Sequence, residues 1–203
     1  FKMDIEFKIS KNPVNYKKAL QLLEKRVEEV KKGGRELVWF LEHPTTYTAG
    51  IRYKKEEILD NSINVIKTNR GGKITLHNPG QKIVYFVIDL NRRKKNIRNL
   101  VREIENIIIK FLKIYKIKSY ADKKNIGIWV NRKKIAAIGI RVSRWVAYHG
   151  FSININNDLD GYKKIIPCGL DNEKITSFEK EGKESFNINR NLRNIFLKNL
   201  PKI

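Results

Sequence analysis

The chain has 203 residues, with 43 Lys and Arg against 21 Asp and Glu, and a formal net charge of +22 at pH 7. Its hydrophobic share of 41% and its recurring apolar runs are typical of a folded protein and exclude an intrinsically disordered one, and the length suits a single domain over residues 1–203. The longest apolar run, residues 83–88, is far shorter than the roughly 20 residues of a membrane-spanning helix, so no membrane partner is expected.

The net charge indicates a class of partner without fixing it. A strongly basic protein attracts polyanions and acidic proteins over long distances. Lys, Ile and Asn are frequent along the whole chain, so a general composition bias explains the charge equally well. The single cysteine cannot form an internal disulfide, and the charged N-terminal residues do not resemble a secretion signal. We therefore expect a cytoplasmic, reducing location.

The first predicted elements are a strand, a helix and a second strand. Alternating apolar residues indicate a strand over residues 5–9, and Asn12-Pro13 is typical of a helix start. Gly33-Gly34 is expected to end that helix, and a compact apolar strand follows over residues 37–41. We interpret residues 45–50, TTYTAG, as a turn-rich connection. The buried stripe of the helix is formed by Tyr16, Leu20, Leu23, Val27 and Val30.

The middle of the chain predicts more strands and a second helix. A block of strands begins at Val65-Ile66 and leads to an apolar strand over residues 82–90. An amphipathic helix follows over residues 100–112. Its predicted polar face carries Arg102, Glu103 and Lys110.

The last third predicts hairpins and a final helix. Residues 126–130 and 135–142 flank a short polar loop and indicate a hairpin, and residues 147–155 are expected to pair next. A last helix is expected over residues 191–200. Helices mixed irregularly with hairpins favour an α+β domain, a mixed sheet flanked by helices, over a doubly wound fold.

Cys168 is the candidate for covalent chemistry. Pro167 stiffens the chain before it, and Gly169 lets a substrate carbonyl approach the backbone after it. A lone cysteine is more often a small buried hydrophobic residue, and an unperturbed thiol is only slightly ionised at neutral pH. A catalytic role therefore needs a nearby cation that stabilises the thiolate.

Lys134 is the lysine whose context suits that task. It lies directly before the apolar segment IAAIG, whereas most lysines belong to charged runs; Lys133 beside it is the competing cation. His77 and His149 are the other candidate bases, although each alone fits a hydrogen-bonded structural histidine better. No cluster of Cys or carboxylates accompanies them, so we expect no metal site.

The segment Arg70-Gly71-Gly72 is too short to indicate a phosphate loop or an RNA-binding segment. The pattern GxxxxGK[ST] is absent, so we expect no nucleotide site. The glycines suit a turn or the close approach of a ligand. If residues 73–77 are extended, Thr75 and His77 face the same pocket because alternate side chains of a strand share a face.

Taken in order, six segments resemble the lipoate-protein ligase B or octanoyltransferase family. They are EHPTTYTAG at 42–50, RGGKITLHNPGQ at 70–81, GIWV at 127–130, KIAAIGIRV at 134–142, HGFSININ at 149–156 and IPCG at 166–169. The resemblance covers most of the chain and makes the catalytic interpretation of Cys168 the favoured one. The chain departs from the family at Leu76, where an aromatic residue is usual, and at Asn78, where glycine is common.

The resemblance implies the α+β fold of the biotinyl and lipoyl protein ligases. It implies transfer of an octanoyl group from octanoyl-acyl carrier protein to a lysine of lipoyl domains, those of the 2-oxoacid dehydrogenases and the H protein of glycine cleavage. Cys168 would hold the acyl thioester, and Lys134 would lower its pKa and act as general acid and base. The acyl site would include His149 in a supporting role and Arg70, Gly71, Gly72, Lys73, Ile74, Thr75, Leu76, His77, Ala137, Ile138, Gly139, Gly150, Phe151 and Ser152.

The chemistry agrees with that assignment and requires no cofactor. Exchange of one thioester for another is nearly isoenergetic, and aminolysis of a thioester to an amide runs downhill, so no ATP is needed. An eight-carbon chain needs an apolar slot with a few polar groups at its mouth. A basic rim would also attract acidic carrier proteins.

Two alternatives stay open at this point. An amidotransferase that moves octanoyl or lipoyl groups between lipoyl-carrier proteins would share every motif. A basic nucleic-acid-binding module is of another class; it is motivated by the charge and would bind DNA or RNA with a steep salt dependence. The family resemblance disfavours nucleic acid as a partner.

Overall fold

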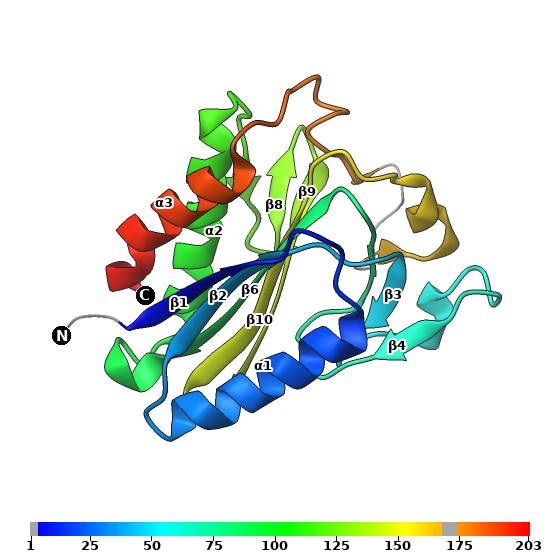
Figure 1. Ribbon diagram of the computed structural model, residues 1–203. Coiled ribbons are helices and arrows are strands. Elements are labelled where there is room, and N and C mark those ends of the chain that lie inside the picture. Colours follow the sequence, from blue (N-terminus) through cyan, green and yellow to red (C-terminus); the bar gives the residue numbers. More distant parts are fainter. Residues whose placement is uncertain (1–3, 168–173) are drawn as a thin grey trace.

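A mixed sheet forms the centre of the molecule (Figure 1). The computed structural model describes residues 4–167 and 174–203, and within these ranges seven strands follow the order β1-β2-β6-β10-β9-β8-β7. β1 and β2 are parallel, and the other neighbours are antiparallel. The strands are β1 (Ile5–Ile9), β2 (Glu36–Leu41), β6 (Gln81–Asp89), β7 (Tyr120–Ala121), β8 (Ile128–Val130), β9 (Lys133–Ser143) and β10 (Val146–Asn154).

Helices cover both faces of this sheet, which confirms the expected α+β class (Figure 1). α1 (Tyr16–Lys31) packs on one face, and α2 (Ile97–Ile114) and α3 (Ile188–Asn199) pack on the other. Short 3-10 turns occur at Lys55–Glu57, Leu90–Arg92, Asp160–Lys164 and Leu200–Lys202. Across the described residues, none of these helices is long and apolar enough to span a membrane.

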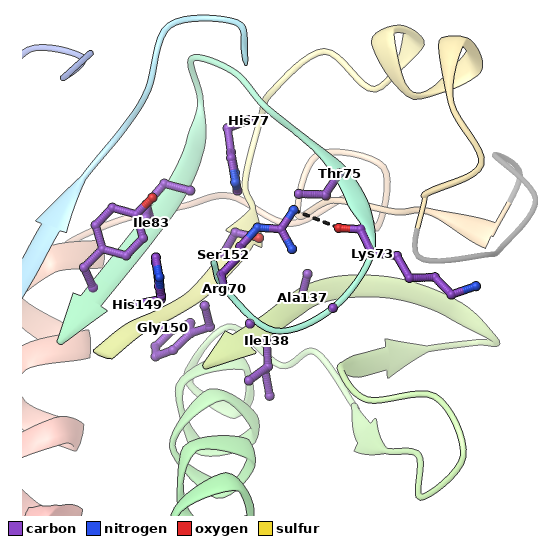
Figure 2. Close-up of a pocket in the computed structure, with 14 residues that line it drawn as sticks. Arg70, Lys73, Thr75, His77, Ile83, Ala137, Ile138, His149, Gly150 and Ser152 are labelled. Atoms are coloured by element: carbon purple, nitrogen blue, oxygen red, sulfur yellow. Dashed lines mark hydrogen bonds between the residues drawn. The ribbon is translucent and has the colours of Figure 1, made fainter. Parts of the chain in front are cut away.

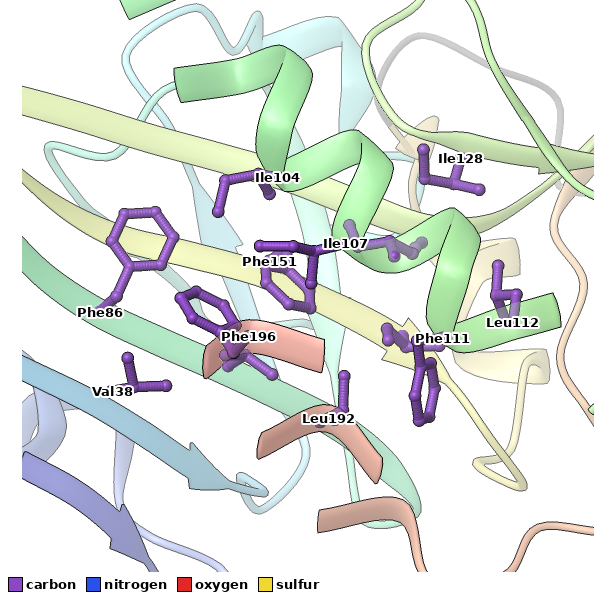
Figure 3. Close-up of a cluster of buried hydrophobic side chains, with 14 of the residues drawn as sticks. Val38, Phe86, Ile104, Ile107, Phe111, Leu112, Ile128, Phe151, Leu192 and Phe196 are labelled. Atoms are coloured by element: carbon purple, nitrogen blue, oxygen red, sulfur yellow. The ribbon is translucent and has the colours of Figure 1, made fainter. Parts of the chain in front are cut away.

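The main core lies between the sheet and the pair α2 and α3 (Figure 3). Alternate residues of β6 point to opposite faces, as the strand period of two requires. Val84, Phe86 and Ile88 join the α2 and α3 side, whereas Ile83, Tyr85 and Val87 join the α1 side. Because β6 is buried on both faces, it reads in the sequence as a continuous apolar run rather than an alternating one.

The helix α1 ends where the glycine pair predicted but begins later than expected. Its N-cap is Asn15, whose side chain accepts from the Lys18 N–H at 3.2 Å, so Asn12-Pro13 precedes the helix. Gly33 has φ +90°, and the Gly34 N–H donates to the Glu29 carbonyl at 2.8 Å. This is a left-handed C-terminal cap that favours glycine.

The stretch predicted as a turn-rich connection contains a strand, so that interpretation is wrong. β3 (Thr46–Ala49) lies between β4 (Val65–Lys67) and β5 (Ile74–His77) in a separate three-stranded sheet. β3 pairs antiparallel with β5 and parallel with β4. The segment forms a strand despite its local turn propensity because it pairs with segments about 20 and 30 residues further along the chain. A local sequence pattern does not reveal such distant pairing.

The two predicted hairpins are confirmed, and both have two-residue turns. Asn131 and Arg132 join β8 to β9 with φ +46° and +63°, and Arg144 and Trp145 join β9 to β10 with φ +48° and +67°. Turns with both central residues at positive φ match the twist of the flanking strands. They place β8, β9 and β10 side by side in the sheet.

The remaining helices differ from expectation in detail. Glu103 was expected on the polar face of α2, but it is buried, with its carboxylate 3.6 Å from Arg102 Nε. The C-terminal residues of the chain lie close by, since Asn99 donates to the Lys202 carbonyl at 2.9 Å, and they help to cover this part of α2. α3 begins at Ile188, three residues before the expected start at 191.

Candidate active site

A cavity lies between the α1 face of the large sheet and the strand β5 (Figure 2). Its walls come from the loop before β5, from β5 itself, and from β6, β9 and β10. The lining residues are Arg70, Gly72, Lys73, Thr75, His77, Ile83, Tyr85, Ala137, Ile138, Gly139, His149, Gly150, Phe151 and Ser152.

The structure gathers most of the residues predicted for the acyl site around this cavity, but Gly71, Ile74 and Leu76 lie outside it. Thr75 and His77 face it together, as expected for an extended segment. Ile74 and Leu76 point to the opposite face, where both are buried against a separate apolar cluster, so the expectation that the whole run lines one site is wrong there. Gly71 lines a neighbouring groove instead. The unusual Leu76 therefore belongs to that cluster and not to this wall.

Arg70 holds the loop that borders the cavity. Its Nη2 donates to the Lys73 carbonyl at 2.9 Å (Figure 2). The same nitrogen donates to the Thr48 carbonyl and hydroxyl, each at 2.8 Å. Its Nη1 donates to the Gly71 carbonyl at 2.9 Å. These bonds tie residues 70–73 to β3, and the guanidinium is occupied by backbone and hydroxyl oxygens instead of by a carboxylate.

The two histidines of the cavity are held neutral. Burial lowers the pKa of His77 to about 3, with a smaller contribution from His43, and it lowers the pKa of His149 to about 3 with help from Arg70. A base works best when its pKa lies near the operating pH, so either histidine is a weak general base at neutral pH. The earlier alternative that one of them activates the thiol loses support.

Each ring is fixed by an amide oxygen. His77 Nδ1 lies 2.7 Å from Gln81 Oε1, and His149 Nε2 lies 2.7 Å from Asn69 Oδ1. An amide oxygen only accepts, so both contacting nitrogens carry the proton and the other nitrogen of each ring is left as an acceptor. For His149 that second nitrogen, Nδ1, is buried and has no hydrogen-bond partner within residues 4–167 and 174–203.

His149 has an unusual backbone conformation inside β10. Its φ is +67°, and its ring stacks on that of Tyr148 with the centroids 4.7 Å apart. Consecutive side chains of a regular strand point to opposite faces, so the left-handed φ is what turns the imidazole toward the cavity. Gly150 follows because a Cβ there would lie 1.9 Å from the Val84 carbonyl oxygen.

Lys134 lines a second, smaller cavity. It is only 5% exposed, its Nζ donates to the Ile126 carbonyl at 3.1 Å, and the ammonium lies 5.1 Å from the ring centroid of Trp129. Lys133, the competing cation, is exposed. The sequence context therefore selected the lysine that points inward.

The two cavities adjoin each other, and the smaller one reaches the segment that precedes the predicted nucleophile. Thr75, Ala137 and Ser152 line both. Pro167 lines the smaller cavity together with Lys134. Cys168 itself, like Gly169, lies outside the described residues.

Residues 165–166 are bound to the segment that connects β3 to β4. The Ile166 N–H donates to the Glu57 carbonyl at 2.7 Å, and Ile165 is buried and pairs with Ile58. The Glu57 carboxylate in turn pairs with Lys73 Nζ at 2.8 Å. Lys73 is thus a second amine beside the site, but its charge is neutralised by a carboxylate.

The two adjoining cavities together form a site with two distinct ends, one at Lys134 and one at His149. Along β9, Lys134 and Ile140, whose Cα partner is His149, are six residues apart, which is roughly 20 Å at about 3.4 Å per residue. Ala137, Ile138 and Gly139 lie between them. In Figure 2, Lys73 and Thr75 lie on one side of the cavity, and Ile83 and His149 lie on the other. An extended octanoyl chain is shorter than this separation.

Sequence reasoning missed several residues of this site. Ile83 and Tyr85 were assigned only to a strand, although their alternation marks one face of β6. His43 was left within a motif; it lines neither cavity but lies behind the wall, with its ring centroid 5.7 Å from that of His77. Its Nδ1 donates to the Val14 carbonyl at 2.6 Å, and its Nε2 accepts from the Tyr85 hydroxyl at 2.8 Å. Burial lowers the pKa of His43 to about 4. Gly127 and Trp129 were quoted without a role.

Comparison with known proteins agrees with the geometry. Residues 15–198 match the lipoyl protein ligase A/B catalytic domain. The chain is 46% identical over 189 residues to an octanoyltransferase of Anaplasma phagocytophilum, a match that covers 90% of this chain and 91% of that protein. It is also 46% identical over 185 residues to an octanoyltransferase of Ehrlichia chaffeensis, covering 88% and 86%.

A solved structure supports the fold independently. The bipartite lipoate protein ligase of Thermoplasma acidophilum superposes with a TM-score of 0.76 at 15% identity, over 98% of this chain and 84% of that chain. At that identity the likeness establishes the fold alone, and it confirms the expected architecture of the lipoyl ligases.

Proposed function

The chain belongs to the lipoate-protein ligase B family, whose members are octanoyltransferases, and is therefore an acyltransferase; from that premise we propose how it performs the transfer. Octanoyl-acyl carrier protein is the donor, and a lysine of a lipoyl domain is the acceptor. The reaction takes place in the cytoplasm and proceeds through a thioester on Cys168.

One observation carries this proposal: Lys134 and Pro167 line the same small cavity, and that cavity adjoins the larger one through Thr75, Ala137 and Ser152. Pro167 is the direct neighbour of Cys168 in the chain. An ammonium at this place stabilises a thiolate by charge. Ile83, Ala137 and Ile138 give the larger cavity apolar walls against which the acyl chain would lie.

The first half-reaction acylates the enzyme. The thiolate of Cys168 attacks the carbonyl carbon of the octanoyl thioester, the bond from that carbon to the carrier sulfur breaks, and the carrier leaves as a thiolate that takes a proton. Lys134 supplies positive charge to the attacking sulfur and a proton to the departing one. The chain of the octanoyl group extends along Ala137, Ile138 and Gly139 toward His149.

The second half-reaction forms the product. The neutral amine of the acceptor lysine attacks the acyl-enzyme carbonyl, the bond to the Cys168 sulfur breaks, and an amide and a free thiolate result. One proton leaves the amine in this step, and Lys134, having given up a proton, is placed to receive it. The groups that would line the acyl carbonyl's end of the slot are Thr75 and Ser152.

The test is a transfer assay with purified apo-lipoyl domain as acceptor. Octanoyl-acyl carrier protein as the sole donor should give octanoylated domain with the wild type and none with Cys168→Ala. An octanoylated lipoyl domain as the sole donor should be inert. Transfer from the second donor and not from the first would replace this proposal with an amidotransferase, and undiminished transfer by Cys168→Ala would remove the thioester.

A further inference from the structure

We propose that Trp129 is a positioning residue for Lys134, and that a β-bulge and Gly127 bring the two side chains together. The inference deepens the proposed function and rests on it. Its starting point is a buried cation in an uncommon setting: Lys134 is 5% exposed, and its described partners are a carbonyl oxygen and an aromatic ring. A buried ammonium needs compensation for the water it has lost.

The bulge sets the two residues opposite each other. Ile128 pairs with Ala136, and Trp129, the next residue, pairs with Lys134, so the register shifts between them and Ile135 is the additional residue of β9. Residues directly opposite in an antiparallel pair share a face. Without the shift, Trp129 would lie opposite Ile135, whose side chain is fully buried in the main core. Bulges of this kind occur next to active sites and re-aim a side chain.

Gly127 makes room for the lysine stem. A Cβ at this position would lie 2.9 Å from Lys134 Cε and 2.8 Å from the Ala136 carbonyl oxygen. Its φ of +139° is also one that side chains rarely adopt. Any other residue at 127 would force the Lys134 stem or the Ala136 backbone to shift.

The indole is itself fixed in place. Trp129 Nε1 donates to the Asn125 carbonyl at 3.0 Å, and the side chain is buried. The ring face therefore has one orientation toward the ammonium, which lies 5.1 Å from the centroid. An ammonium within about 6 Å of a tryptophan face is attracted to it, more strongly where water is excluded.

An aromatic face stabilises the ammonium without cancelling its charge. Lys73 offers the contrast, because the Glu57 carboxylate at 2.8 Å neutralises its field. One N–H of Lys134 donates to the Ile126 carbonyl, and the ammonium, which has three donors, makes no second hydrogen bond among the described residues. The described polar side chains that share its cavity, Thr75, Ser152, Asn154 and Tyr162, include no carboxylate, and Lys133 is exposed. Trp129 thus keeps a full positive charge available to the thiol.

The test measures the pH dependence of thiol alkylation by iodoacetamide in the full-length protein. Cys168 is the only cysteine, so the profile reports one group. Lys134→Met should raise the midpoint by about one pH unit or more, as expected for loss of a neighbouring opposite charge. Trp129→Leu should raise it in the same direction by about half a unit, and Trp129→Phe, which keeps a weaker ring face, by less.

The chain offers a matched control. Trp145 is a partly exposed tryptophan with Lys95 Nζ 5.8 Å from its ring, and Trp145→Leu should leave the midpoint unchanged. Adding Trp129→Leu to Lys134→Met should cause no further shift, whereas a merely structural role would shift both backgrounds alike.

The outcomes separate the two proposals. A shift in Lys134→Met without one in either folded Trp129 variant overturns this inference alone. An equal shift from Trp129→Leu in both backgrounds overturns it as well. No shift in Lys134→Met removes the role of the lysine in the proposed function and this inference with it.

Discussion

The two ends of the site bury polar groups in opposite ways. At the histidine end, formed by His43, His77 and His149, burial lowers each pKa to about 3 or 4, and each ring has a hydrogen-bonded partner. At the lysine end, formed by Lys134, Trp129 and Pro167, a buried cation lies without a described carboxylate.

This difference indicates that the histidine end forms a wall of the site and that the lysine end supplies its reactive group. Neutral, fixed rings enclose an apolar chain without presenting charge to it, and they cost little because their protons already have acceptors. A buried ammonium is costly, so a fold retains it where its charge has a use. The predictions below test this division, from the largest effect to the smallest.

The histidine end should make the protein sensitive to acid. Because the folded pKa values of all three histidines lie below the ordinary 6.5, the unfolded chain binds more protons between pH 6.5 and about 4. Stability is therefore fully present above pH 6.5 and falls with pH through that window, by about 1.4 kcal/mol per pH unit for each histidine.

Urea unfolding at half-unit steps from pH 7 to pH 5 measures that slope, in a range where most carboxylates stay ionised. His149→Asn should reduce the slope by the contribution of one histidine, about 1.4 kcal/mol per pH unit. A wild-type slope below about 1.4 kcal/mol per pH unit would show that the rings titrate in the folded state. The histidine end would then not be a neutral wall.

The lysine end should control the rate and not the stability. Lys134→Met should slow single-turnover acylation by octanoyl-acyl carrier protein about 10²- to 10³-fold, the range expected for loss of a positioned acid-base group. Lys133→Met is the control, since that neighbouring side chain is exposed and should change the rate by less than about twofold. Equal losses from both substitutions would mean that general positive charge, and not this site, drives the reaction.

A side chain at position 150, directly after His149, should destabilise the fold. Gly150→Ala adds a Cβ that would meet the Val84 carbonyl oxygen at 1.9 Å, so β6 and β10 would have to separate. We expect a loss of about 1–3 kcal/mol in the free energy of unfolding. Gly182→Ala is the comparison, because a Cβ there meets no atom within 4 Å, although its φ of +65° causes some strain. Equal losses in urea melts would remove the packing argument.

Several of these features could be predicted from the sequence, because they depend on local patterns. Most of the apolar stripe of α1, the two hairpins and the inward position of Lys134 follow from residues close together in the chain. Within the stripe, Leu20 was expected to be buried but is half-buried, and Ala19 beside it is buried instead. The buried Glu103, β3 as a strand of a second sheet, and the division of residues 70–77 between two faces depend on distant partners.

The arrangement around Lys134 was beyond sequence reasoning for the same reason. Whether Trp129 faces Lys134 or the core depends on one additional residue in β9, which no periodicity reveals. The left-handed φ of His149 is likewise rare for a non-glycine residue and has no local signal other than the glycine that follows.

The smallest expected effect concerns the net charge of +22. If this charge steers an acidic carrier protein, lowering the salt concentration from about 150 to 50 mM should raise the acylation rate severalfold with octanoyl-acyl carrier protein and leave it unchanged with a small octanoyl thioester. Equal salt effects on both donors would assign the charge to composition bias.

The most direct test of the account is the intact mass of the protein after incubation with octanoyl-acyl carrier protein. Wild type should gain one octanoyl group that hydroxylamine removes, Lys134→Met should gain it slowly, and Cys168→Ser should gain none on the same timescale. An adduct on Cys168→Ser equal to that on wild type would contradict a thiolate held beside Lys134 as the acyl carrier.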